Sequence, residues 1–163
     1  MGGAAAPPTL VTMSTPGCVV VLAGISESPI GVEDLRARVA GPSHGAVVTF
    51  DGVVRDHDTP GRGAVTLLDY EAHPDAAAVV QRVAEEVAAT SSAGSLAVLH
   101  RVGPLVVGDC ALAVAVSAAH RGDAFATAAA LVDAVKDRLP VWKHQHFADG
   151  SDEWVGLGEL SPR

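Results

Sequence analysis

The sequence is short of aromatic residues and of positive charge, and each shortage excludes something. Only six of the 163 residues are Trp, Tyr or Phe, so the core must be built from Val, Leu and Ala, which the 48% hydrophobic content supplies. The formal net charge of −8 argues against nucleic-acid binding, because phosphate backbones recruit basic surfaces. It still allows one small anionic ligand in a locally basic pocket.

Long apolar runs are also missing. No segment reaches the roughly 18 consecutive apolar residues that a membrane helix needs. The N-terminus lacks the basic stretch followed by an apolar one that marks a secretory signal, so we expect a cytoplasmic protein. There is no P-loop and no GxGxxG after an expected strand, and nothing therefore marks a nucleotide-binding fold.

Cysteine is scarce. Cys18 and Cys110 are the only two, they stand far apart, and they form no CxxC motif. Each falls in an apolar run that is typical of a strand. We interpret them as buried, reduced thiols, and a catalytic thiol is the less favoured alternative.

The length fits a single domain. Residues 1–16 are rich in Gly, Ala, Pro and Thr without periodicity and are expected to form a disordered tail. Residues 17–156 should form the folded domain, and residues 157–163 a C-terminal tail.

Hydrophobic periodicity predicts three helices and seven strands. The helices are expected at 32–39, from Pro74 to a helix-ending Gly94, and at 123–139, the last with Phe125 facing inward. Strands are expected at 18–23, 45–55, 64–71, 96–101, 111–117, 141–147 and 153–155. Paired strands between helices favour hairpins and an antiparallel or mixed sheet, so we predict an α+β fold with helices packed on the sheet.

Two lysines stand seven residues apart on either side of a proline, in the segment KDRLPVWK at 136–143. Because proline ends a helix, Lys136 should close a helix and Lys143 should begin an extended segment. Two cations that converge from different elements indicate an anion-binding pocket. Trp142, beside Lys143, could form one wall of that pocket for a flat ligand.

Further basic residues stand at the ends of expected strands, where folds commonly present functional groups. Arg55 serves either a binding site or a surface ion pair with a neighbouring aspartate. His120 and Arg121 directly precede the last helix, and the start of a helix attracts anions. The alternative for this pair is a helix cap at the surface.

His144 and His146 would lie on one face of a strand, because side chains alternate. A metal site would need a third ligand, for which the candidates are His57, Asp58 and His120. No recognised metal-binding spacing supports such a site. His100 shows no pattern of its own.

Six segments, taken together and in order, resemble the large, catalytic subunit of molybdopterin synthase across residues 17–156. They are GAVVTFDGVVR at 45–55, YEA at 70–72, VLHRVG at 98–103, VSAAHR at 116–121, KDRLPVWK at 136–143 and WV at 154–155. Each segment alone is modestly specific, whereas their order and spacing together are highly specific.

The resemblance implies a hammerhead-like α+β fold and a central homodimer within a heterotetramer. Each subunit would bind a small ubiquitin-like partner whose C-terminal Gly-Gly carries a thiocarboxylate. The enzyme would be a sulfurtransferase of molybdenum cofactor biosynthesis that converts cyclic pyranopterin monophosphate to molybdopterin by adding two sulfurs. It would need no cofactor, no metal and no catalytic cysteine.

By motif, the resemblance also implies roles for individual residues. Lys136 and Lys143 are the expected catalytic lysines. The substrate pocket is expected to include Val53, Val54, Arg55, Lys136, Lys143, His144 and Gln145. His120 and Arg121 would bind the substrate's phosphate from the other subunit of the dimer, and Phe50 would pack near the incoming tail.

Two other functions stay open at this point. A non-catalytic relative could keep the pocket to bind a phosphorylated ligand or a ubiquitin-like partner, although both lysines weigh against it. A metal-dependent hydrolase could be built on His144 and His146, and a metal assay would separate it from the other two.

Overall fold

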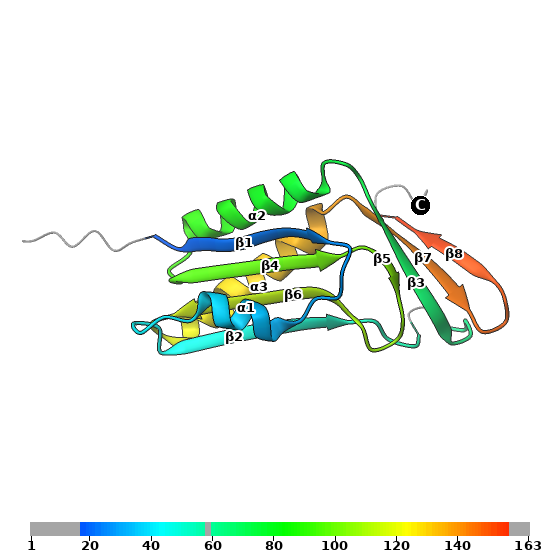
Figure 1. Cartoon of the computed structure of the whole chain (residues 1–163), viewed down its shortest axis with the longest axis horizontal. Helices are drawn as coiled ribbons and strands as arrows, with labels where there is room; N and C mark the ends of the chain where they lie inside the picture. Colours follow the sequence, from blue (N-terminus) through cyan, green and yellow to red (C-terminus); the bar gives the residue numbers. More distant parts are fainter. Residues whose placement is uncertain (1–16, 58–59, 157–163) are drawn as a thin grey trace, which may run out of the picture.

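The computed structural model describes residues 17–57 and 60–156. The strands form two sheets of four, one of which is covered by helices, and the second lies beyond its end (Figure 1). Both expected tails, 1–16 and 157–163, lie outside the described residues. Within the described part of the chain, no helix is long and apolar enough to cross a membrane.

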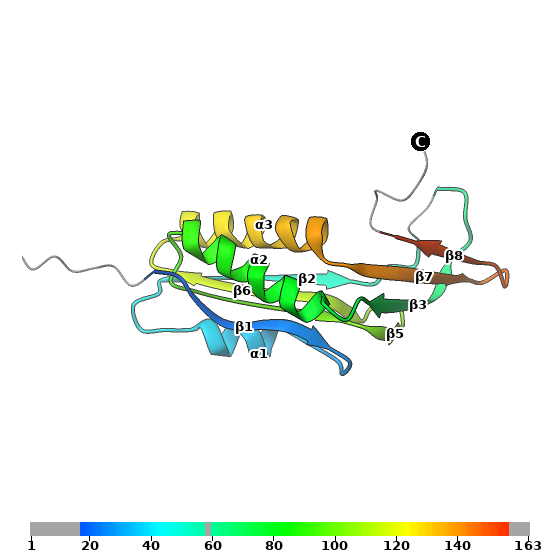
Figure 2. The same cartoon turned by 90° about the horizontal axis from the view of Figure 1, so that it is seen from above.

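The first sheet has the strand order β1-β4-β6-β2. Strands β1 and β4 pair in parallel, whereas β6 pairs antiparallel with both of its neighbours. Helix α1 covers one face, and α2 and α3 lie side by side on the other (Figure 2). The bounds are β1 Val19–Ser26, α1 Val32–Val39, β2 Ala46–Val53, α2 Ala76–Thr90, β4 Ser95–Arg101, β6 Cys110–Ala118 and α3 Arg121–Arg138.

The sequence of β6 explains this three-layer arrangement. The strand is buried on both faces, as a near-continuous apolar run predicts. Val114 and Val116 pack in the core under α2 and α3. Ala113 and Ala115 pack with Leu35 in the core under α1, because small residues on that face leave room for the helix.

The second sheet is antiparallel throughout, with the order β5-β3-β7-β8. Its strands are β3 Val65–Ala72, β5 Gly103–Leu105, β7 Val141–Phe147 and β8 Asp152–Val155. The chain passes from β4 to β5 at Gly103, whose φ of 88° is a conformation that glycine adopts without strain. It passes from α3 to β7 at Pro140, as the proline predicts.

The expected α+β class is confirmed, and α1 has the predicted bounds. The strands, however, divide over two sheets. Strands β7 and β8 form the expected hairpin, whereas β2 and β3 do not pair and belong to different sheets. The short strand β5 at Gly103–Leu105 was not predicted from the sequence pattern.

Two side-chain predictions are wrong. Phe125 does not face inward, because 62% of it is exposed. Gly94 does not end α2, which stops at Thr90. Gly94 instead lies in the following turn, where its N–H donates to Ser117 O at 2.8 Å. A Cβ there would lie 2.1 Å from His44 Nε2, so close packing explains the glycine.

Gly94→Ala should lower the free energy of unfolding, because His44 cannot easily move away. The His44 ring donates from Nδ1 to Ser117 Oγ at 2.8 Å, and Ser117 Oγ in turn donates to Val39 O. We expect a loss of about 1–3 kcal/mol, typical of overpacking. Urea unfolding at fixed protein concentration measures it.

The control is the same substitution in a His44→Ala background, where the obstructing ring is gone. The cost of Gly94→Ala should then fall to a small fraction of its first value, which a double-mutant cycle reports. An equal cost in both backgrounds would show that His44 is not the obstacle.

Candidate functional site

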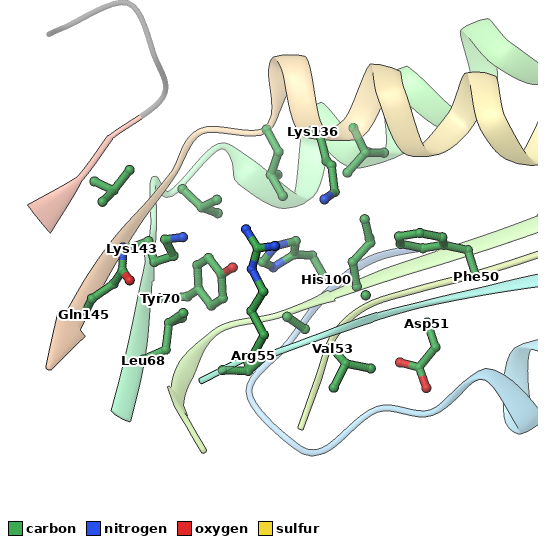
Figure 3. A pocket seen from close by; sticks show the side chains of 18 of the residues that line it. Phe50, Asp51, Val53, Arg55, Leu68, Tyr70, His100, Lys136, Lys143 and Gln145 are labelled. Carbon is green, nitrogen blue, oxygen red and sulfur yellow. The ribbon is translucent and has the colours of Figure 1, made fainter. Parts of the chain in front are cut away.

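A pocket of about 600 Å³ lies where the two sheets meet. Its lining comes from the end of β2, the end of α3, the start of β6, the end of β8, and strands β3, β4 and β7. Figure 3 shows the labelled side chains around this hollow. Its volume is in the range of small-molecule sites.

Three cationic side chains reach this pocket from three separate elements. Lys136 stands in the last turn of α3, where the helix dipole favours a cation. Lys143 lies on β7, beyond the proline, and Arg55 follows the end of β2. All three line the pocket. The two lysines therefore converge on one pocket from different elements, as the sequence predicts.

The end of β2 shapes the wall beside Lys136. Phe50 lines the pocket, and Lys136 Nζ lies 6.0 Å from the centre of its ring, at the outer limit of a cation–π contact. The pairing of β2 with β6 shifts register between Gly52 and Val53. Val54 is buried, whereas half of Val53 is exposed, and both line the pocket as expected.

The β7 side chains divide between two faces. Val141, Lys143 and Gln145 face the pocket. Trp142 and His144 alternate with them and are not part of its lining. Neither residue therefore occupies the pocket wall or edge where the sequence analysis placed it, because the pleat turns both to the other face.

His144 belongs to a separate cluster on the hairpin of β7 and β8. Its Nε2 donates to Asp152 Oδ2 at 2.7 Å, and its ring stacks on Trp154 at 4.1 Å. The hydrogen bond from His144 lowers the pKa of Asp152. His146 is the other ring neighbour of His144.

This cluster does not have the ligands of a metal site. No group of three potential metal-binding side chains occurs in residues 17–57 and 60–156. Of the possible third ligands, His57 pairs with Asp56, His120 stands at the start of α3, and Asp58 lies outside the described residues.

His120 and Arg121 lie away from the pocket of their own chain. They stand at the start of α3, whereas Lys136 stands near its end, and 15 residues of helix span roughly 22 Å. Both are exposed and neither lines the pocket. Within one chain, only three of the four expected cations therefore come together.

Two pocket residues were not singled out from the sequence. Tyr70 and His100 both line the pocket, and their rings meet edge to face at 4.9 Å. Burial, and then the positive charge of Lys136, lower the pKa of His100 to about 4. The imidazole is therefore neutral at physiological pH. Both residues fall within segments of the resemblance, and that was the only available signal.

Gln145 is also notable, because only 1% of it is exposed. Its side-chain oxygen Oε1 is buried without a hydrogen-bond partner in the described chain. A buried unpartnered acceptor is costly, and this residue lines the pocket. It can accept a hydrogen bond from a bound ligand.

The two cysteines are free thiols and only partly buried. Burial raises the pKa of Cys18. Burial, followed by the neighbouring Asp51, raises the pKa of Cys110 to about 12. Neither environment favours the thiolate that a nucleophile requires, so neither has the environment of a catalytic thiol.

The pocket combines several cations with neutral hydrogen-bonding groups and an apolar wall. Such a site can hold two anionic groups close together, because the side chains offset their mutual repulsion. It can also stabilise charge that develops when an acyl group is transferred.

Comparison with known proteins shows the family to which this chain belongs. The MoaE protein family matches residues 25–138. A molybdopterin synthase catalytic subunit from Nostoc is 35% identical over 136 residues, which cover 82% of this chain and 81% of that protein.

Solved structures agree. The molybdopterin synthase structure from Staphylococcus aureus aligns with a TM-score of 0.74 at 30% identity, covering 82% of this chain and 96% of that one. The complex of subunits 1 and 2 of molybdopterin-converting factor from Helicobacter pylori aligns with a TM-score of 0.63, covering 85% and 91%, but at 15% identity it supports the fold alone. By sequence and by fold, the chain belongs to the MoaE family of molybdopterin synthase catalytic subunits.

Proposed function

We propose that this chain is the sulfurtransferase subunit that converts cyclic pyranopterin monophosphate to molybdopterin. Two sulfurs would come from the thiocarboxylated C-terminus of a small ubiquitin-like subunit. The observation that carries the proposal is the meeting of Arg55, Lys136 and Lys143 in one pocket. The homodimer, the heterotetramer with the small subunit, and a cytoplasmic location belong to the same proposal.

The charges of the pocket suit these two reactants. The substrate carries a cyclic phosphate and the partner brings a thiocarboxylate, so both approach as anions. Arg55 and Lys143 can hold them against their mutual repulsion. Lys136, which lies opposite Phe50, would act on the acyl carbonyl or assist proton transfer, while Lys143 mainly binds substrate.

The partner supplies the sulfur, so this chain needs no thiol of its own. The thiocarboxylate sulfur would attack a substrate carbon that carries oxygen. The carbon–oxygen bond would break with its electron pair leaving on oxygen, which takes up a proton, and an acyl–sulfur–carbon link would form. Water would then add to the acyl carbon, the acyl–sulfur bond would break with its electron pair remaining on sulfur, and the tail would leave as a carboxylate. The raised pKa of Cys110 accords with this division of labour.

A second copy of the chain would bring the fourth cation to the pocket. Strand β2 pairs only with β6 among the described strands, and so forms one edge of its sheet. The start of β2 pairs with the end of β6 at Ala118, which precedes His120 by two residues. The other end of β2 lies at the pocket. Two β2 edges side by side and antiparallel would therefore bring His120 and Arg121 of each copy to the pocket of the other.

An apolar groove of about 320 Å³ along this edge supports the same contact. It lies between β2 and α3 and is lined by Val48, Thr49, Phe50, Phe125, Ala128, Ala129, Val132 and Asp133. The ring of Phe125 is exposed, although a large apolar side chain on a helix is usually buried. A second subunit that covers this groove would bury the ring. A closed twofold dimer uses the same patch on both copies.

Lys136→Ala should reduce turnover by at least about 100-fold while the chain stays folded, because a cation that stabilises developing charge is lost. The assay mixes the variant with a thiocarboxylated small subunit and cyclic pyranopterin monophosphate. Product is detected by mass as the gain of two sulfurs, and circular dichroism confirms folding.

The matched control is Arg138→Ala. Arg138 stands in the same turn of α3, but it pairs with Glu86 at the surface and does not line the pocket. It should leave turnover close to that of the wild type. Normal turnover of Lys136→Ala would refute the role of that lysine.

The sharing of residues across the dimer predicts complementation between two inactive variants. Differently tagged Lys136→Ala and Arg121→Ala chains are co-expressed, and heterodimers are purified through both tags. One pocket of each heterodimer would then hold an intact Lys136 and an intact Arg121. Turnover should rise to about half of the wild-type value, because one of two symmetric sites is restored.

The outcome differs if both residues act within one chain. Each pocket of the heterodimer would then lack one of them, and turnover would stay at the level of the parent variants. Homodimers of each variant, purified with the same two-step procedure, set that level.

Removing both thiols tests the origin of the sulfur. The double substitution of Cys18 and Cys110 by Ala should leave the yield of dithiolene product unchanged. In the wild type, alkylation of both thiols at pH 8 should be slow compared with a free cysteine, because the raised pKa values leave little thiolate. Loss of product in a folded double variant would show that the chain itself carries sulfur.

A further inference from the structure

The proposed reaction has not yet used the chemistry of His100, which lines the pocket. Only 7% of it is exposed, and it lies on β4 beside Tyr70 of β3 and within the electrostatic reach of Lys136. Figure 3 labels it among the side chains that surround the pocket. A neutral imidazole among cations offers what they lack, namely a lone pair.

The hydrogen bond of His100 fixes which nitrogen carries that lone pair. Nδ1 lies 2.7 Å from the backbone oxygen of Arg101. A carbonyl oxygen only accepts hydrogen bonds, so Nδ1 must hold the proton of the neutral ring. Nε2, on the opposite side of the ring, is left as an acceptor.

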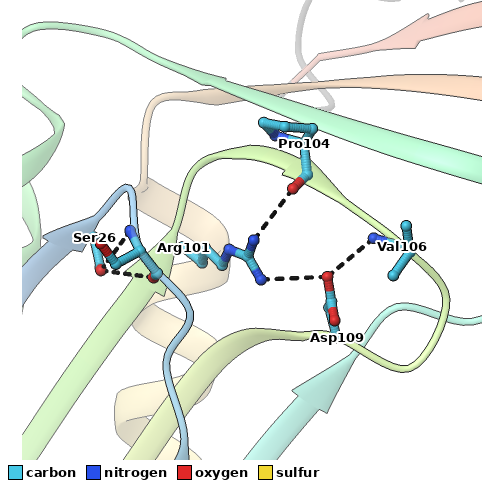
Figure 4. A network of polar contacts seen from close by, with 6 residues as sticks. Ser26, Arg101, Pro104, Val106 and Asp109 are labelled. Carbon is cyan, nitrogen blue, oxygen red and sulfur yellow. Dashed lines mark hydrogen bonds and ion pairs between the residues drawn. The ribbon is translucent and has the colours of Figure 1, made fainter.

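The support behind His100 is rigid. Arg101 donates from Nη1 to Asp109 Oδ2 at 3.2 Å and from Nη2 to Pro104 O at 3.3 Å. Asp109 Oδ2 also accepts the N–H of Val106 at 3.0 Å, as Figure 4 shows. The edge contact with Tyr70 restrains the ring from another side. The imidazole therefore cannot easily turn to present Nδ1 instead.

An acceptor in this position suits a ligand that brings a hydrogen-bond donor. Arg55, Lys136 and Lys143 can donate hydrogen bonds but cannot accept them, and they suffice for anionic groups. N–H and O–H groups of a substrate need an acceptor when they are buried, because an unpaired buried donor is costly.

We propose that His100 contacts the substrate directly and accepts, at Nε2, a hydrogen bond from an N–H or O–H group of its ring system. The inference rests on the proposed function and adds a specificity residue to it. A reduced pterin carries several such donors beside its phosphate. His100 would thus select a heterocycle with donors over a simple phosphate ester.

Two variants of similar shape test the acceptor. His100→Gln keeps a carbonyl oxygen in the pocket, whereas His100→Met fills similar space without a comparable acceptor. For His100→Met, kcat/KM for cyclic pyranopterin monophosphate should fall by about tenfold, the effect of one hydrogen bond. His100→Gln should recover most of that loss, and the affinity for the small subunit should be unchanged in both.

His73→Phe is the matched control, because His73 is exposed and does not line the pocket. Equal losses for Gln and Met would indicate a packing role and overturn the proposal, as would wild-type kinetics for Met. The wild type is assayed in parallel. If it fails to form dithiolene, the proposed function fails, whereas an active wild type with an equally active Met variant ends only this inference.

A measurement on the wild type covers the case in which the variants do not fold. With ¹⁵N-labelled histidine, the Nε2 resonance of His100 should fall in the range of an unprotonated nitrogen between pH 6 and 8. This resonance should shift when the substrate is added to saturation, because the lone pair of Nε2 then accepts a hydrogen bond. A protonated Nε2, or no response at saturation, would rule out the contact.

Discussion

The repulsion among three cations is the constraint on which the site depends. Arg55, Lys136 and Lys143 share one pocket, and like charges that line one cavity oppose one another. Each is held by a different element, so the electrostatic repulsion is distributed over α3, β7 and the segment after β2. Anions that enter the pocket would offset this repulsion, so the arrangement of the three side chains is organised for negative charge before a ligand binds.

Holding these groups in place falls to the junction of the two sheets. The chain crosses from the first sheet to the second through β5, which pairs with β3. The largely buried side chain of Arg101 ties this crossing to Asp109 and Pro104, while Val54, Leu68, Leu105 and Ala111 form a small apolar core beneath it. The same tie positions the carbonyl that orients His100. Structural support and recognition of the ligand thus meet in one short segment.

The sequence predicted what depends on local rules and missed what depends on tertiary contacts. Pro140 separates helix from strand, so Lys136 and Lys143 could be placed on different elements. The face that His144 occupies could not be fixed, because alternation gives only relative orientation. Phe125 fitted a buried helical stripe, but it lines a groove between α3 and β2 and is exposed there. His100 had no pattern, because its meaning comes from Tyr70 and the pocket around it.

The unpaired edge of β2 affects how the subunit behaves before it assembles. Its segment AVVTFDGV is rich in residues of high β propensity, and among the described strands it pairs on one side only. An open strand of this composition templates indiscriminate pairing with other chains, which leads to aggregation. A newly made copy is therefore exposed until that edge is covered. Solubility in the cell, and not activity alone, would then depend on prompt assembly.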